Sequence, residues 1–147
     1  MKIEVIVAVS CEEFFDILME SLRHDIKAAT GDAIDVEALK SGYTYDKKLA
    51  NKFGHENSSK TTLTKIDYPN CYEIKFSTHR GDNWLRYELQ DLNNGTTKII
   101  YEESYDASTK SQAANHNMMK YFYKWSAKKR IIKMINQIEE HIKTQRK

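Results

Sequence analysis

Apolar and polar residues alternate at the start of the chain and then recur at helical spacing. Residues 2–9 place every second side chain, from Ile3 to Val9, on one apolar side, which predicts a half-buried strand. Ser10 is followed three residues later by Glu13, a capping box that predicts the start of a helix. This helix is expected to run to about Ala29 and to end at Gly31. Its predicted apolar face consists of Phe14, Phe15, Leu18, Leu22 and Ile26.

A short second helix is predicted between Asp32 and Leu39, and from Tyr43 to Asp106 the period changes to two. The turn residues of this region are Pro, Gly and Asn at hairpin spacing, with Gly95 at a position that needs a positive φ. The pattern predicts five antiparallel strands, at residues 43–50, 60–67, 71–79, 84–92 and 96–106.

The register of three hairpins follows from keeping the apolar residues on one face, because a slip of one residue would exchange the faces. Three apolar pairings are predicted: Leu89 with Ile99, Phe76 with Tyr87, and Ile66 with Tyr72. They place opposite charges across from each other on the other face. These charged pairs are Arg86 with Glu102, Lys75 with Glu88, and Lys65 with Glu73.

The last part of the chain carries apolar residues at steps of three and four, which predicts one long helix that covers the apolar face of the sheet. Thr109 and Gln112 are expected to open it as a second capping box. The residues expected to be buried against the sheet are Met118, Phe122, Trp125, Ile132 and Ile135, and those expected in water are Lys120, Lys124 and Lys133.

This order of elements, with the stretches from Ser10 to Phe15 and from Met118 to Trp125, resembles the helix-grip superfamily of START-like and birch-pollen-allergen-like domains. The sequence looks similar to an uncharacterised family of low-GC Gram-positive bacteria. The resemblance implies an α+β fold with a curved antiparallel sheet of about six strands, a long C-terminal helix across one face and one or two short N-terminal helices. It also implies an apolar ligand held between sheet and helix.

The composition narrows the class of protein. The chain has 147 residues, 40% hydrophobic and 30% charged, which is an ordinary balance for a single globular domain spanning 1–147. Two cysteines are too few for a disulfide framework and favour a reducing, cytoplasmic location. No run of residues reaches the length of a membrane span, so membrane insertion is not expected.

The apolar face of the predicted sheet is rich in tyrosine, and Glu103 falls on it opposite Leu85. Buried tyrosine hydroxyls need partners, which either a ligand pocket or a packed core with hydroxyls at its rim would supply. The sequence leaves both arrangements open. The candidate ligand-binding residues are Tyr72, Phe76, Tyr87, Tyr101, Glu103, Met118, Phe122 and Trp125. No metal site, cofactor or catalytic motif is predicted.

Two other functions remain open at this stage. Residues 120–147 carry nine Lys/Arg against two Asp/Glu, so the last helix could bind an acidic partner, although nothing in the sequence favours nucleic acid. An enzyme of the cyclase or hydrolase kind could use scattered residues such as Glu103, Tyr101, Tyr87 and His79. Cys11, in the first turn of a helix, is expected to be a buried and inert thiol. A homodimer is also left open.

Overall fold

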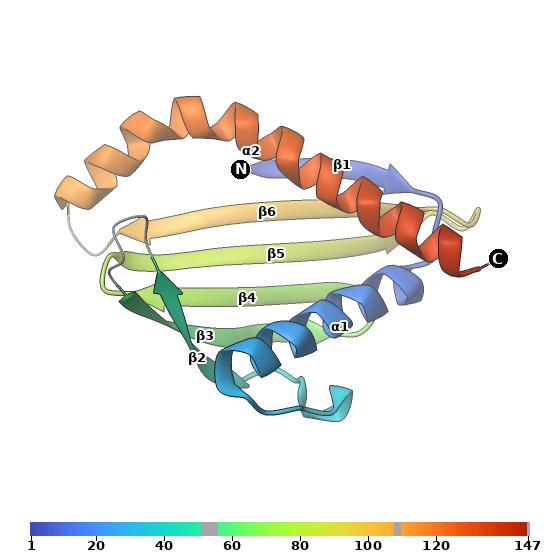
Figure 1. Ribbon diagram of the computed structural model, residues 1–147. Coiled ribbons are helices and arrows are strands. Elements are labelled where there is room, and N and C mark those ends of the chain that lie inside the picture. Colours follow the sequence, from blue (N-terminus) through green and yellow to red (C-terminus); the bar gives the residue numbers. More distant parts are fainter. Residues whose placement is uncertain (51–55, 108–109, 147) are drawn as a thin grey trace.

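The computed structural model describes the backbone of residues 1–50, 56–107 and 110–146, and the side chains of residues 1–48, 58–106 and 127–146. Within these ranges the chain forms one six-stranded antiparallel sheet and two long helices on its concave side (Figure 1). The elements in order are β1 (Lys2–Val7), α1 (Cys11–Thr30), the short 3-10 helix η1 (Val36–Ala38), β2 (Thr44–Ala50), β3 (Glu56–Asp67), β4 (Cys71–Thr78), β5 (Gly81–Asp91), β6 (Thr97–Ala107) and α2 (Lys110–Gln145).

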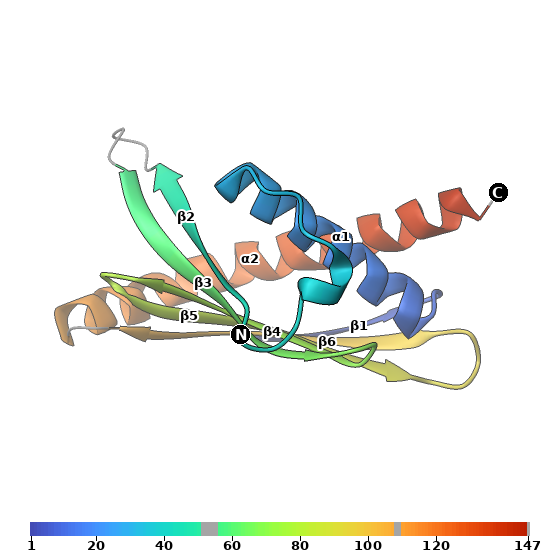
Figure 2. The same ribbon diagram turned by 90° about the horizontal axis from the view of Figure 1, so that it is seen from below.

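The strands lie in the order β1-β6-β5-β4-β3-β2, so the first strand closes one edge of the meander. Seen from below, the sheet bends towards the helices, and β2 and β3 rise beside α1 (Figure 2). The predicted α+β architecture is therefore confirmed. The strand limits agree with the sequence to within a few residues; β3 and β5 begin earlier than expected, and β1 ends earlier.

Helix α1 begins and ends as the sequence predicts. The Ser10 hydroxyl accepts a hydrogen bond from the Glu13 amide at 3.1 Å, and the Glu13 carboxylate accepts one from the Ser10 amide at 3.0 Å. At the other end Gly31 adopts φ 81°, a left-handed conformation that favours glycine, and its amide donates to the Lys27 carbonyl. The whole predicted apolar face is buried.

Two of the three predicted hairpin registers are confirmed and one is wrong. Leu89 pairs with Ile99, and Ile66 pairs with Tyr72, as expected. Phe76, however, lies opposite Asn83, because Thr78 already pairs with Gly81 across a two-residue turn. The Thr78 side chain accepts a hydrogen bond from the Arg80 amide in this turn.

The shift at the β4–β5 hairpin changes partners without changing faces, because it amounts to an even number of residues. Lys75 lies opposite Trp84 rather than Glu88, so this predicted charge pair is not formed across the strands. Arg86 instead lies opposite Glu73 on one side and Glu102 on the other. The apolar and the polar face are assigned correctly by the sequence.

The helical layer is shared by the two helices, whereas the sequence suggested α2 as the cover. Helix α1 lies over the centre of the sheet, where the Phe14 ring is 6.3 Å from that of Tyr87 and the Phe15 ring 6.4 Å from that of Tyr72. Helix α2 begins beyond the end of β6, arches along that side of the sheet, and passes over β1 towards the start of α1 (Figure 1).

The second half of α2 buries a face that differs from the predicted one by one position. Ile135 is buried as expected, but Ile132 is 38% exposed, and the neighbouring Ile131 is buried in its place. Adjacent residues on a helix point in directions about 100° apart, and here the side of α2 that faces the rest of the protein includes Ile131 and not Ile132. Lys133 is exposed as predicted. The proposed Thr109 cap and the side chains of Met118, Lys120, Phe122, Lys124 and Trp125 lie outside the described residues.

An ion pair joins the two helices where the chain ends. The Arg146 guanidinium donates to both oxygens of the Glu13 carboxylate, with Nε at 2.9 Å from Oε2. The Arg146 hydrogen bonds, followed by that of the Ser10 amide, lower the pKa of Glu13 from 4.5 to about 2. The same carboxylate therefore both starts α1 and holds the end of α2.

The packing of α1 on the sheet predicts a large loss of stability for Phe14→Ala. Phe14 is fully buried, and removing a buried phenylalanine side chain costs about 3–5 kcal/mol in free energy of unfolding. Ile6 on β1 is 63% exposed, so Ile6→Ala should change stability by less than about 0.5 kcal/mol. Urea unfolding of both variants checks the prediction, and equal losses would contradict it.

The ion pair predicts a pH-dependent effect of Glu13→Gln. Because the folded-state pKa of Glu13 lies below its ordinary value, its charge stabilises the fold above about pH 4.5, and this contribution is lost as pH falls towards 2. The pair is partly exposed, so the variant should lose no more than about 1 kcal/mol at neutral pH. Denaturant unfolding at several pH values should show the difference shrinking below about pH 4. A difference that does not vary with pH would rule out this origin.

Candidate functional site

The concave face of the sheet is divided into a packed part and a partly accessible part. The cross-strand row of Tyr72, Tyr87 and Tyr101 is buried, with at most 7% of each residue exposed. In the two rows beyond it, towards the β4–β5 turn, Ile74 is buried, but the other residues of β4, β5 and β6 keep some accessible surface. We call these residues the accessible half: Phe76, Asn83, Leu85, Glu103 and Tyr105.

The tyrosine row forms the boundary between the two parts. The Tyr87 ring lies edge-on at 5.1 Å from that of Tyr101 and at 5.9 Å from that of Tyr72. Burial, more than the nearby charges, raises the pKa of Tyr72 and of Tyr87 above its usual range. Both phenols are therefore neutral at physiological pH. Their rings belong to the core beneath α1.

Glu103 lies in the next row, opposite Leu85 as the sequence predicts. Its carboxylate accepts a hydrogen bond from the Tyr101 hydroxyl. Its main chain pairs with Met1 in both directions, each nitrogen lying 2.9 Å from the other residue's carbonyl oxygen. The backbone on both sides of this position is thus fixed, and it holds the carboxylate on the concave side.

Two buried hydroxyls lie on the same face at the opposite side of the sheet. Ser59 and Thr61, on β3, are at most 1% exposed. Thr61 lies opposite Tyr45, whose hydroxyl it can bond, whereas the Ser59 hydroxyl has no hydrogen-bond partner among the described residues. Thr61 pairs with Phe76 across the strands, which places it in the same row as part of the accessible half. A buried hydroxyl without a partner costs free energy unless a water or a ligand supplies one.

Helix α1 is tied to β2 beside these hydroxyls. The Tyr45 hydroxyl and the Lys47 ammonium each lie 2.5 Å from an oxygen of the Asp25 carboxylate. Burial, followed by the hydrogen bond to Asp25, raises the pKa of Tyr45 above its usual range. Sequence reasoning missed this contact, because the three residues belong to no recognisable motif and the helix spacing does not reveal their proximity.

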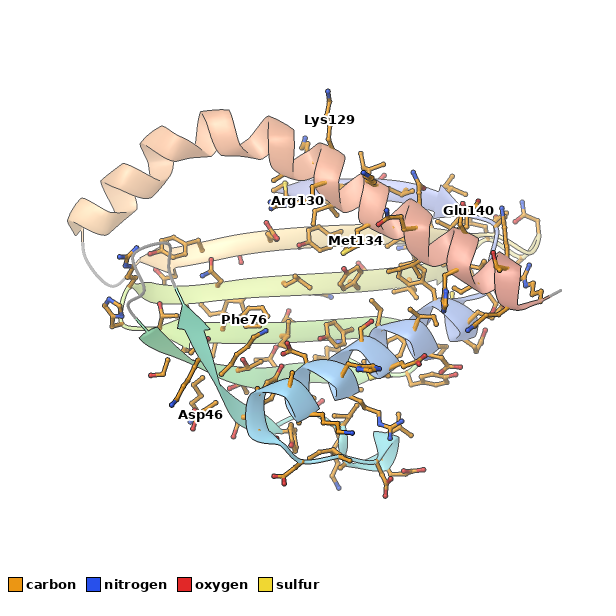
Figure 3. The ribbon with its side chains drawn as sticks, viewed as in Figure 1. Asp46, Phe76, Lys129, Arg130, Met134 and Glu140 are labelled. Atoms are coloured by element: carbon orange, nitrogen blue, oxygen red, sulfur yellow. The ribbon has the colours of Figure 1, made fainter. Side chains whose placement is uncertain are left out.

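Several other candidate residues are buried and unreactive, exposed to solvent, or outside the described side chains. Cys11 is buried, and burial is the main cause that raises the pKa of its thiol, as expected for an inert cysteine. His24 and His79 are exposed, and His116 lies outside the described side chains. Lys129 points away from the sheet (Figure 3). No group of three or more His, Cys, Asp or Glu residues in the described part could hold a metal ion.

A hollow of about 500 Å³ is lined mainly by charged residues of the other, convex face, and it also borders Met1 and Glu103 at the edge of the sheet. Arg86 lies 3.9 Å from Glu73, and Lys2 lies 3.8 Å from Glu102. These residues form a ladder of alternating charges across four strands, which is a usual arrangement for the wet face of a sheet. The charged lining of this hollow is therefore explained by the solvated face of the sheet and does not indicate a binding site.

The curved antiparallel sheet, the N-terminal helix that covers its centre and the long C-terminal helix along its concave side define a helix-grip fold. The family model described as Domain of unknown function (DUF3284) matches residues 1–124, and the chain belongs to this family. No curated protein matches the sequence. Within the described residues no helix is long and apolar enough to cross a membrane.

Solved structures share the fold at low sequence identity. A protein of unknown function from Staphylococcus aureus, SA2116, has a TM-score of 0.61 and 11% identity over 99% of this chain and 96% of its own. A conserved protein from Geobacillus kaustophilus has a TM-score of 0.60 and 18% identity over 97% and 94%. The allergen Ara h 8.0201 has a TM-score of 0.60 and 9% identity over 98% and 97%. These similarities establish the helix-grip fold.

The buried phenols predict an unusual alkaline titration. Since the pKa values of Tyr45, Tyr72 and Tyr87 are raised, the neutral phenols stabilise the fold below the ordinary pKa of about 10, and this stability is lost as pH rises above it. Ultraviolet absorbance of phenolate should rise in two stages, the second together with loss of the far-ultraviolet dichroism. A single stage near pH 10 with the fold intact would contradict this assignment.

Proposed function

We propose that this protein binds a hydrophobic or aromatic small molecule on the accessible half of the concave face, beneath α2. The observation that carries the proposal is the combination of partly accessible apolar side chains, Phe76 and Leu85, with the polar pair of Tyr101 and Glu103 on a face that is otherwise packed. Small-molecule sites are mostly apolar with a few placed polar groups. The helix-grip fold supports the same function.

The proposed site combines residues from the sheet with residues from the first half of α2. Phe76 lies on β4 in the area between the two helices (Figure 3), and Leu85 lies beside it on β5. Both would contact the apolar body of the ligand. The tyrosine row would close the site towards α1, because its rings are already packed. The proposed lining is Tyr72, Phe76, Tyr87, Tyr101 and Glu103 from the sheet, with Met118, Phe122 and Trp125 from α2.

The sheet part of this site is rigid before any ligand arrives. Its strands β4, β5 and β6 are each paired on both sides. The buried row of tyrosines beside it, on the same face of the sheet, is held in place by Phe14 and Phe15. A preformed floor lowers the entropic cost of binding. The adjustable wall would be α2, whose second half is anchored by Ile131 and Ile135.

The proposal predicts saturable binding of a neutral apolar probe, N-phenylnaphthylamine, whose fluorescence increases in apolar surroundings. Leu85→Ala should weaken this binding severalfold, because it removes apolar contact worth about 1 kcal/mol. The matched control is Leu92→Ala, which truncates the same residue type in the exposed β5–β6 turn and should leave the affinity unchanged.

A second readout locates the probe. The chain has two tryptophans, Trp84 on the convex face and Trp125 on α2. In a Trp84→Phe variant the remaining tryptophan emission should be quenched as the probe binds. Absence of saturable binding, or equal effects of the two leucine substitutions, would overturn the proposed function.

The other two functions considered for the sequence stay predictions. The outer face of α2 combines Lys129 and Lys133 with the exposed Ile132 and with Glu140. This mixture of basic, apolar and acidic side chains is as typical of a solvated helix face as of a binding surface for an acidic partner. For an enzymatic role, His79 is exposed at the β4–β5 turn, where the Tyr105 hydroxyl donates to the Arg80 carbonyl.

A further inference from the structure

We infer that the ligand carries a protonated amine and that this cation binds the Glu103 carboxylate. The inference rests on the proposed function and adds the chemical class of the ligand. It follows from the surroundings of Glu103, from the positions of the cations on the sheet, and from the buried hydroxyls of β3.

Among the residues whose side chains the structure describes, the Glu103 carboxylate has one hydrogen-bond donor, which is neutral. The Tyr101 hydroxyl donates to it, while its cross-strand neighbours are Leu85 on one side and Met1 on the other. Both neighbouring side chains pack against the hydrophobic core. A carboxylate in partly apolar surroundings is costly unless a cation or several hydrogen bonds compensate it.

The side-chain cations of the neighbouring strands pair on the convex face. Lys2, Arg86 and Lys98 form ion pairs with Glu102, Glu73 and Glu4, all on the convex face. The N-terminal ammonium donates to the main-chain carbonyl of Glu103. Among the described residues, no ion pair is made to the Glu103 carboxylate, and Lys129 points away from the sheet (Figure 3).

The buried hydroxyl of Ser59 is an independent sign that a polar ligand atom meets this face. Ser59 and Thr61 are both buried on the concave side of β3; Thr61 lies opposite the Tyr45 phenol, and the Ser59 hydroxyl lacks a partner among the described residues. Three strand spacings separate β3 from β6, which corresponds to about 14 Å across the sheet. An elongated ligand with an amine at Glu103, an apolar body over Leu85 and Phe76, and a polar atom towards β3 would satisfy all these groups.

The test compares three probes that share a ring and differ in the head group: naphthylmethylamine, naphthylmethanol and naphthoate. At neutral pH these are a cation, a neutral donor and an anion. Isothermal titration of the wild-type protein should show the amine binding about tenfold tighter than the alcohol, since a charge-assisted hydrogen bond replaces a neutral one. Naphthoate should bind more weakly than either.

Two matched variants assign the preference to Glu103. Glu103→Gln keeps the size of the side chain and an acceptor for Tyr101, and it should lower the affinity for the amine to that for the alcohol. Glu102→Gln removes the same charge one residue earlier on the convex face, and the preference should survive it. Circular dichroism and Tm of both variants check that the fold is kept.

The outcomes separate the inference from the proposed function. Equal binding of the three probes, a preference for naphthoate, or an unchanged preference in Glu103→Gln would overturn the amine assignment and leave the binding site standing. If no probe binds and N-phenylnaphthylamine does not bind either, the proposed function falls and the inference with it. If Glu103→Gln does not fold, the order of the three wild-type affinities still decides the inference.

Discussion

The aromatic contact between α1 and the sheet is the interaction on which the rest of the structure depends. Phe14 and Phe15 lie on one face of a helix that a capping box starts, and they reach Tyr87 and Tyr72 in the middle of the sheet. Because the tyrosines are cross-strand neighbours, the same contact joins β4, β5 and β6 under one helix. It therefore fixes the helix, the strands and the limit of the accessible half together.

The features that the sequence predicted correctly depend either on the alternation of side chains along a strand or on a hydrogen bond between residues close in sequence. Side chains alternate between the faces of a strand, so both faces of the sheet were assigned correctly even where the register of the Phe76 hairpin was wrong. The caps at Ser10 and Gly31 could be predicted because they need only residues close in sequence. Glu103 was placed on the concave face, opposite Leu85, by the same parity.

The sequence was uninformative wherever the structure depends on how far a helix extends over the sheet. It could not show that α1 covers the tyrosine row while Phe76 and Leu85 remain partly accessible, because both sets look equally apolar along the strands. The choice between Ile131 and Ile132 on α2 failed for a related reason. Adjacent isoleucines fit the helical period almost equally well, and only the crossing direction of the helix decides between them.

The two acidic residues Glu102 and Glu103 show how the sheet creates different chemistry from neighbouring positions. Glu102 faces the convex side, where Lys2 pairs with it and water screens its charge. Glu103 faces the concave side, where a phenol is its donor and methionine and leucine are its neighbours. The strand therefore separates two carboxylates by face alone. Because water screens the charge of Glu102, this residue contributes little to the choice of a ligand. The less polar surroundings of Glu103 strengthen any interaction between its carboxylate and a charged group.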